Sequence, residues 1–147
     1  MAISACLLGD KVRYDGKHKS HEPIINFLSD NQLPSIKWMP FCPEVGIGLS
    51  VPRDKIQLEQ GAEQIHVFGV LNHTCDVTDA LKSYAVNFMQ QHPDVECYIV
   101  KSKSPSCGYQ STPLFQRIKG KNQLLGFSSG MFTRTISAMK PQLKIIE

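Results

Sequence analysis

Apolar residues recur at helical spacing in three segments of the chain, residues 23–28, 78–89 and 128–139. Side chains three and four residues apart line one face of a helix, and Pro, Ser and Thr favour its first turn. Pro23, Thr78 and the pair Ser128 and Ser129 stand where such first turns belong. The pattern therefore predicts three amphipathic helices.

Short apolar runs, many of them β-branched, alternate with these segments and predict strands at residues 2–5, 36–41, 65–70, 95–100 and 143–146. Parallel neighbouring strands need a crossover, which a helix between them supplies. The alternation predicts an α/β fold of the Rossmann-like, three-layer kind with a largely parallel sheet. Residues 56–70 fit a local hairpin as an alternative.

The length of the chain and its balance of charges indicate what class of protein it is. A chain of 147 residues with 41% hydrophobic residues supports one hydrophobic core, so residues 1–147 are expected to form a single domain. The 16 basic and 13 acidic residues nearly balance, which predicts no strong attraction to nucleic acid or to an anionic membrane. Neither a signal peptide nor a membrane span is visible, and a soluble cytoplasmic protein is expected.

Three of the five cysteines follow predicted strands. Cys6, Cys42 and Cys107 come after the first, second and fourth of them, whereas Cys97 lies inside a strand and Cys75 precedes a helix. The carboxyl ends of parallel strands meet at one edge of a sheet, where ligands bind. Cytosolic cysteines are more often metal-binding or catalytic than disulfide-bonded. The pattern predicts one shared site for three thiols and leaves its occupant open.

Five motifs identify a family that this sequence resembles. They are SACLLG, VRYDG, CPEV with GLSVPR, DVT and KSKSPSCG, which follow in this order from about Ile3 to Gly108. The set resembles the thiouracil desulfidase family. The resemblance implies an α/β domain whose 4Fe-4S cluster is held by Cys6, Cys42 and Cys107, with one iron left open. It also implies sulfur removal from thiouracil, or from 4-thiouridine in nucleosides or transfer RNA.

Candidate catalytic residues lie beside these cysteines. An open iron favours a thiocarbonyl sulfur, after which water attacks the carbon and sulfide leaves without net redox change. Glu44, two residues after Cys42, is our candidate general base, with a capping glutamate as its structural alternative. Ser104 or Ser106 is expected to hydrogen-bond or protonate the pyrimidine, and Ser104 is preferred.

Two further residues are candidates for binding substrate, a thiolated pyrimidine or nucleoside or a thiolated transfer RNA. Arg13 offers a donor for a ring carbonyl and Tyr14 a face for stacking, although Arg13 could instead pair with Asp15 or Asp76. Arg53 either anchors a phosphate or braces the loops.

Two other functions use the same residues. The three cysteines could hold zinc or form a redox pair, although the five histidines show no zinc spacing. Alternatively, the chain could bind thiolated bases without catalysis. The sequence leaves the oligomeric state and the physiological substrate open.

Overall fold

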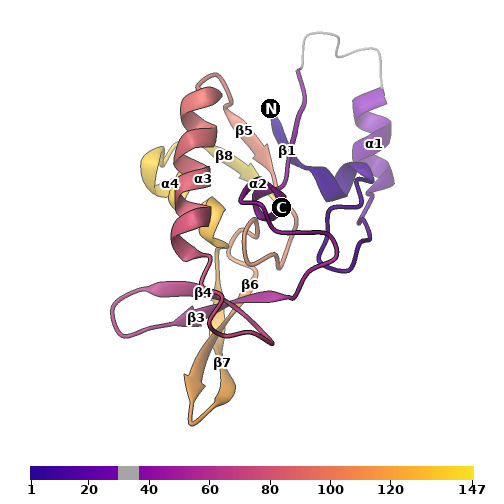
Figure 1. Ribbon diagram of the computed structural model, residues 1–147. Coiled ribbons are helices and arrows are strands. Elements are labelled where there is room, and N and C mark those ends of the chain that lie inside the picture. Colours follow the sequence, from indigo (N-terminus) through magenta and orange to yellow (C-terminus); the bar gives the residue numbers. More distant parts are fainter. Residues whose placement is uncertain (30–36) are drawn as a thin grey trace.

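The computed structural model describes residues 1–29 and 37–147 (Figure 1). Its helices are η1, a 3₁₀ helix (Ala5–Leu8), α1 (Glu22–Ser29), α2 (Pro43–Gly46), α3 (Thr78–Gln91) and α4 (Met131–Met139). Its strands are β1 (Ala2–Ser4), β2 (Met39–Phe41), β3 (Ile56–Gln60), β4 (Ile65–Gly69), β5 (Cys97–Ile99), β6 (Thr112–Ile118), β7 (Lys121–Ser128) and β8 (Lys144–Ile146). No helix of the described residues is long and apolar enough to cross a bilayer.

The predicted α/β class is confirmed by a parallel sheet, sheet A, with the strand order β2-β1-β5-β8. The strands are shorter than the apolar runs that predicted them, and the run at 36–41 begins at Ile36, outside the described residues. The chain passes from β1 to β2 on one side, whereas β5 and β8 are added on the other. The strand order therefore reverses between β1 and β5, the position at which open α/β sheets bind ligands.

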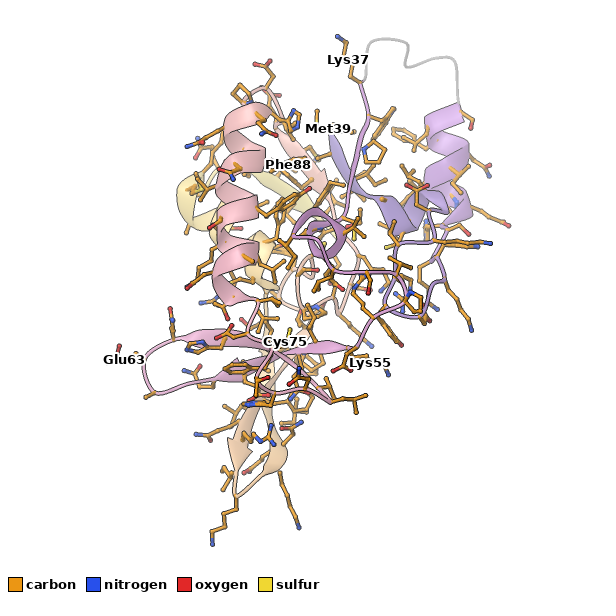
Figure 2. The ribbon with its side chains drawn as sticks, viewed as in Figure 1. Lys37, Met39, Lys55, Glu63, Cys75 and Phe88 are labelled. Atoms are coloured by element: carbon orange, nitrogen blue, oxygen red, sulfur yellow. The ribbon has the colours of Figure 1, made fainter. Side chains whose placement is uncertain are left out.

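Helices cover both faces of sheet A. Successive strand residues point to opposite faces, so neighbouring residues of β1 contact different helices. Ala2 and its neighbour Tyr98 pack with Phe88 of α3 and with α4 in one core cluster. Figure 2 shows Phe88 turned from α3 toward the strand that carries Met39. On the other face, Ile3 packs against α1. The predicted three-layer arrangement is therefore present around sheet A.

A second sheet, sheet B, was not predicted as a separate unit. Its strand order is β4-β3-β6-β7, with β3 antiparallel to β4 and parallel to β6, and with β7 antiparallel to β6. The pair β3–β4 confirms the hairpin alternative for residues 56–70. Leu58 and Val67 pack against Leu81 of α3 and Met131 of α4, so these two helices contact both sheets.

The hairpin β6–β7 and the start of α4 differ from the sequence prediction. Pro113 and Gly126 interrupt the apolar pattern of the two strands, and a bulge shifts their register after Leu114. These interruptions hid both strands. Ser128 ends β7 and does not open a helix; α4 begins at Met131, with Gly130 as its cap residue.

Candidate functional site

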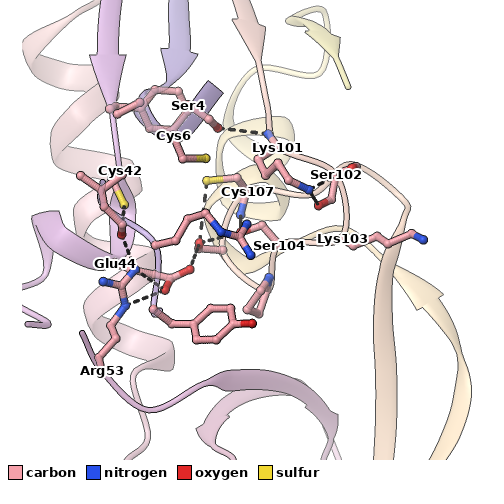
Figure 3. Close-up of a pocket in the computed structure, with 17 residues that line it drawn as sticks. Ser4, Cys6, Cys42, Glu44, Arg53, Lys101, Ser102, Lys103, Ser104 and Cys107 are labelled. Carbon is pink, nitrogen blue, oxygen red and sulfur yellow. Dashed lines mark hydrogen bonds and ion pairs between the residues drawn. The ribbon is translucent and has the colours of Figure 1, made fainter. Parts of the chain in front are cut away.

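A cavity of about 200 Å³ opens at the carboxyl ends of β1, β2 and β5 (Figure 3). The segments that follow these strands form most of its wall, which is the position predicted for a shared site. The structure brings together all the site residues singled out from the sequence: Cys6, Arg13, Tyr14, Cys42, Glu44, Ser104, Ser106 and Cys107. Their chemical roles stay predictions, whereas their common location is a structural fact.

Two of the cysteines are placed by short helices that follow their strands directly. Cys6 lies in η1, whose left-handed cap at Gly9 (φ 102°) turns the chain back toward the cavity. Cys42 is the cap residue of α2, and Pro43 fits the first helical position because its missing N–H would be unpaired there anyway. Each of these two cysteines therefore has a fixed position just after the end of its strand.

The third cysteine is held by the start of α4. The N–H groups of Met131 and Phe132 donate to the carbonyl oxygens of Pro105 (2.9 Å) and Ser106 (3.0 Å). The hydroxyl of Thr133 donates to the Cys107 carbonyl at 2.5 Å. The N–H groups of Met131 and Phe132 are among those that a helix leaves unpaired at its first turn. The loop around Cys107 is therefore clamped to the helix.

Close packing at this clamp explains the glycine that caps α4. A Cβ atom on Gly130 would lie 2.5 Å from the carbonyl carbon of Ser106 and 2.7 Å from the carbonyl oxygen of Ser104. Both are backbone atoms, which cannot move aside as a flexible side chain can. Only glycine lets the loop and the helix approach this closely.

The three thiols share an electrostatic environment. Burial raises the pKa of Cys6, and the nearby Cys42 raises it further. Burial and then Cys42 likewise raise the pKa of Cys107, against hydrogen bonds from Ser106 and Ser4. Burial also raises the pKa of Cys42, opposed by a backbone hydrogen bond from Val45. Three neighbouring thiolates at this site therefore require compensating positive charge, which metal ions provide.

Glu44 is fixed at both carboxylate oxygens. Ser106 Oγ donates to Oε1 at 2.8 Å, while Arg53 Nε and Nη2 lie 2.9 and 2.7 Å from Oε2. Arg53 also donates to the carbonyl oxygens of Val12 (2.8 Å) and Ser50 (3.0 Å). The Arg53 side chain is only 5% exposed and that of Glu44 13%. Arg53 therefore braces the loops and the carboxylate, the second of its two predicted roles.

A chain of hydroxyl groups leads to this carboxylate. Ser104 Oγ lies 3.0 Å from Ser106 Oγ, and it accepts the backbone N–H of Cys107 at 3.1 Å. Because Ser106 donates its proton to Glu44, its oxygen is free to accept the proton of Ser104. Ser106 is buried whereas Ser104 is partly exposed. The two serines therefore differ in position although both line the cavity.

Another part of the cavity wall is positively charged. Arg13 Nε lies 3.6 Å from Asp15 Oδ1, and among the described residues it is a buried side-chain nitrogen without a hydrogen-bond partner. The Arg13 guanidinium carbon and Lys55 Nζ lie 5.4 and 4.9 Å from the centre of the Tyr14 ring. The predicted pair with Asp15 is thus present at long range.

Lys101 and Lys103 also line this cavity and were missed from the sequence. Burial lowers the pKa of Lys101, and so does the nearby Arg13, whereas Cys6 raises it. Both lysines lie within KSKSPSCG, the motif that carries Cys107, so a signal was present in the sequence. With Arg13 and Arg53 they surround the thiols by cations, which suits a negatively charged occupant.

The arrangement of the cysteines bears on the kind of metal centre. No three His, Cys, Asp or Glu side chains of residues 1–29 and 37–147 are arranged to hold one metal ion. All five cysteines are free thiols. Ligands of a multi-iron cluster bind separate irons and need not converge on one point, unlike the ligands of a tetrahedral zinc ion. The three thiols and the surrounding cations fit the chemistry of an anionic iron–sulfur cluster, whose ligands are thiolates.

Comparison with known proteins agrees with this chemistry. The whole chain, residues 1–147, matches the family described as 2-thiouracil desulfurase. The chain belongs to this family. Within it, the chain is 29% identical over 116 residues to the uncharacterized protein YbbK of Bacillus subtilis (strain 168), covering 72% of this chain and 71% of YbbK.

A solved structure is similar to nearly all of this 2-thiouracil desulfurase family member. The match is to the [4Fe-4S]-dependent thiouracil desulfidase TudS, with a TM-score of 0.68 and 28% sequence identity. It covers 99% of this chain and 88% of the TudS chain. The family resemblance drawn from the five motifs and the predicted α/β class are thereby confirmed.

Proposed function

We propose that this protein is a desulfidase that converts a thiolated pyrimidine and water into the oxo-pyrimidine and hydrogen sulfide, without net redox change. The observation that carries the proposal is the Ser104–Ser106–Glu44 chain, which ends in the cavity that Cys6, Cys42 and Cys107 share. The family and the 4Fe-4S dependence of the similar TudS structure support it.

Cys6, Cys42 and Cys107 would hold the 4Fe-4S cluster. When bound with one iron lacking a protein ligand, the cluster supplies a Lewis acid with high affinity for the thiocarbonyl sulfur. Every other part of the reaction falls to side chains of this chain. Because Arg53 and Ser106 bind both oxygens of Glu44, its carboxylate is held in one orientation at the cavity wall.

Proton transfer follows the order of the hydrogen bonds. Water that attacks the thiocarbonyl carbon must lose its protons, and Ser104 is the partly exposed member of the relay. Ser104 accepts a proton and passes its own to Ser106, which passes one to Glu44. Glu44 thus acts as the general base through two hydroxyl groups. The departing sulfur takes up the protons and leaves as hydrogen sulfide, which balances the reaction.

Substrate binding falls to the cationic side of the cavity. The Arg13 guanidinium is our candidate donor to a ring carbonyl, and Tyr14 beside it is our candidate stacking face. The family supports a thiolated pyrimidine as the substrate, and we extend the proposal to the free base, the nucleoside and transfer RNA.

The decisive experiment is sulfide release by protein reconstituted with iron and sulfide without air. We expect sulfide and uracil in equal amounts from 2-thiouracil or 4-thiouracil, together with a brown protein. Metal analysis and product analysis separate the alternatives. One zinc per chain, unaffected by the iron supply, would favour the zinc protein. A reversible disulfide between two of the three cysteines would favour the redox protein. Tight binding of thiouracil without sulfide release would favour the noncatalytic module.

A further inference from the structure

Positive charge is concentrated in the last third of the chain. Residues 101–147 contain eight of the sixteen Lys and Arg residues but only one of the thirteen Asp and Glu residues, Glu147. The first 100 residues contain the other eight basic and twelve acidic residues. The small net charge of +3 therefore conceals an acidic part and a strongly basic part. Such asymmetry is typical of proteins that bind polyanions.

The hairpin β6–β7 presents part of this charge to solvent. Figure 1 shows it extending away from the helices, at the end of the molecule opposite α1. Lys119 and Gly120 both have left-handed φ angles (48° and 77°), which makes a tight two-residue turn between Ile118 and its partner Lys121. Arg117, Lys119 and Lys121 are exposed around this turn. Residues 112–129 contain no Asp or Glu.

The hairpin is attached directly to the wall of the cavity. Thr112 Oγ1, at the start of β6, donates to the Ser104 carbonyl at 2.8 Å. The N–H of Lys103 donates to Ser111 Oγ at 2.8 Å. Lys103 is itself exposed and lines the cavity. Cationic side chains therefore occur at the cavity rim and at the hairpin tip, and one continuous segment joins them.

The hairpin also has exposed apolar side chains and an open edge. Phe127 is 63% exposed, and Leu124 and Leu125 are 52% and 47% exposed. β7 is the last strand of sheet B, whereas segment 75–77 covers the outer side of β4 at the other edge. A protein partner would have to match three cations with an acidic patch. The phosphates of RNA match them along any sequence, and an aromatic ring such as Phe127 stacks on unpaired bases.

We infer that the β6–β7 hairpin binds single-stranded RNA, with Arg117, Lys119 and Lys121 on the phosphates and Phe127 on a base. RNA bound at the hairpin would lie next to the cavity. Only the role of this RNA as carrier of the thiolated base rests on the proposed function; RNA binding itself does not.

The test uses the full-length reconstituted protein and a fluorescein-labelled, unmodified single-stranded RNA of about 12 nucleotides, followed by anisotropy. The triple variant Arg117→Gln, Lys119→Gln, Lys121→Gln should weaken binding at least about tenfold near 0.1 M salt. The slope of log Kd against log salt should fall by about 2, because each phosphate contact on a single strand contributes about 0.7. Phe127→Ala should weaken binding without changing this slope.

A matched control removes the same charge elsewhere. Lys11→Gln, Lys37→Gln, Lys82→Gln should bind RNA like the parent chain. Equal weakening by both triple variants, or parent protein that does not bind the RNA in low salt, would overturn the inference. Capture by phosphatidylglycerol vesicles in place of RNA would overturn it as well. Sulfide release from free thiouracil should stay at the parental rate in the hairpin variant, so a failed hairpin and a failed desulfidase give different results.

Discussion

The cavity edge of sheet A and the β6–β7 hairpin of sheet B differ in almost every property. The cavity follows strands of three residues each, and its polar side chains are mostly bonded to one another. The hairpin has strands of seven and eight residues, and its side chains are mostly exposed. Short strands suffice at the cavity because their ends, not their lengths, determine which loops meet.

The cavity and the hairpin are also stabilised by different interactions. At the cavity, one buried ion pair and a helix start hold residues from distant parts of the chain. Along the outer part of the hairpin, backbone pairing is the main interaction, whereas Thr112 and Leu114 at its base contact the cavity loop and the core. Substitutions should therefore have large effects at the cavity and small effects at the hairpin, except on binding.

The largest contrast is expected between two cysteines. Cys107→Ala removes a predicted cluster ligand, so iron content and sulfide release should fall to background. Cys75, which Figure 2 places beside the β3–β4 hairpin, packs against sheet B and serves as the control. Cys75→Ala should keep both iron and activity. Full activity in Cys107→Ala would remove the basis for the three-cysteine site.

Glu44→Gln should lower kcat by about 10²–10⁴-fold, because the amide cannot accept the proton that Ser106 delivers. The cluster absorbance should remain, since the ligands are unchanged. Glu96→Gln, at an exposed position before β5, is the matched control and should leave kcat unchanged. Steady-state sulfide release at saturating substrate is the measurement, and an unchanged kcat in Glu44→Gln would exclude this residue as the base.

Two phenylalanines compare the packing of the regions directly. Phe132 of α4 is fully buried in the core against sheet A, whereas Phe127 of β7 is 63% exposed. Phe132→Ala should lower the free energy of unfolding by about 3–5 kcal/mol. Phe127→Ala should change it by no more than about 0.5 kcal/mol. Denaturant titrations of both variants test this, and similar losses would show that the hairpin side chains carry more packing energy than their exposure indicates.

An effect smaller than that of Phe132→Ala is expected where sheet B meets α3. Asp76 Oδ1 accepts the N–H of Thr78 at 2.9 Å, and the Thr78 hydroxyl also donates to it. Partial burial alone would raise the pKa of Asp76, but hydrogen bonds from Thr78 and then His66 lower it below 3.8. The charged form is thus stabilised by folding. Its contribution is complete above pH 3.8 and is lost as the pH falls through the lowered pKa.

Asp76→Asn should therefore reduce the free energy of unfolding by about 0.5–1 kcal/mol at neutral pH, the size of a helix-cap contribution. The difference from the parent chain should shrink in strong acid. Asp79→Asn, whose carboxylate is 94% exposed in the first turn of α3, provides the comparison and should change stability less. Thermal unfolding over a pH series measures both, and a difference that grows in acid would reverse the assigned sign.

Sequence reasoning succeeded where function depends on strand ends. The apolar runs before Cys6, Cys42 and Cys107 were enough to place these residues at one edge, because parallel strands align their carboxyl ends. The same argument placed Glu44 at this edge, since it follows Cys42 by two residues. These are local properties of the chain, which single-sequence patterns report well.

Sequence reasoning failed where partners are chosen across the fold. Glu44 and Ser106 are 62 residues apart, and no local pattern announces their hydrogen bond. Arg53 was left with two open roles for the same reason. The second sheet was missed because the pairing of β3 with β6 joins segments separated by a helix and by the cysteine loop. Tertiary packing decided these features.

The clamp between the Cys107 loop and α4 sets an order for the maturation of the protein. A ribosome that has just completed the Cys107 loop has not yet made the amides of Met131 and Phe132 that hold it. A nascent chain therefore lacks the clamp on its third cysteine until α4 has emerged from the ribosome. Cluster assembly is thus expected to follow the synthesis of α4, so a chain truncated before α4 should stay without iron however well its first two cysteines fold.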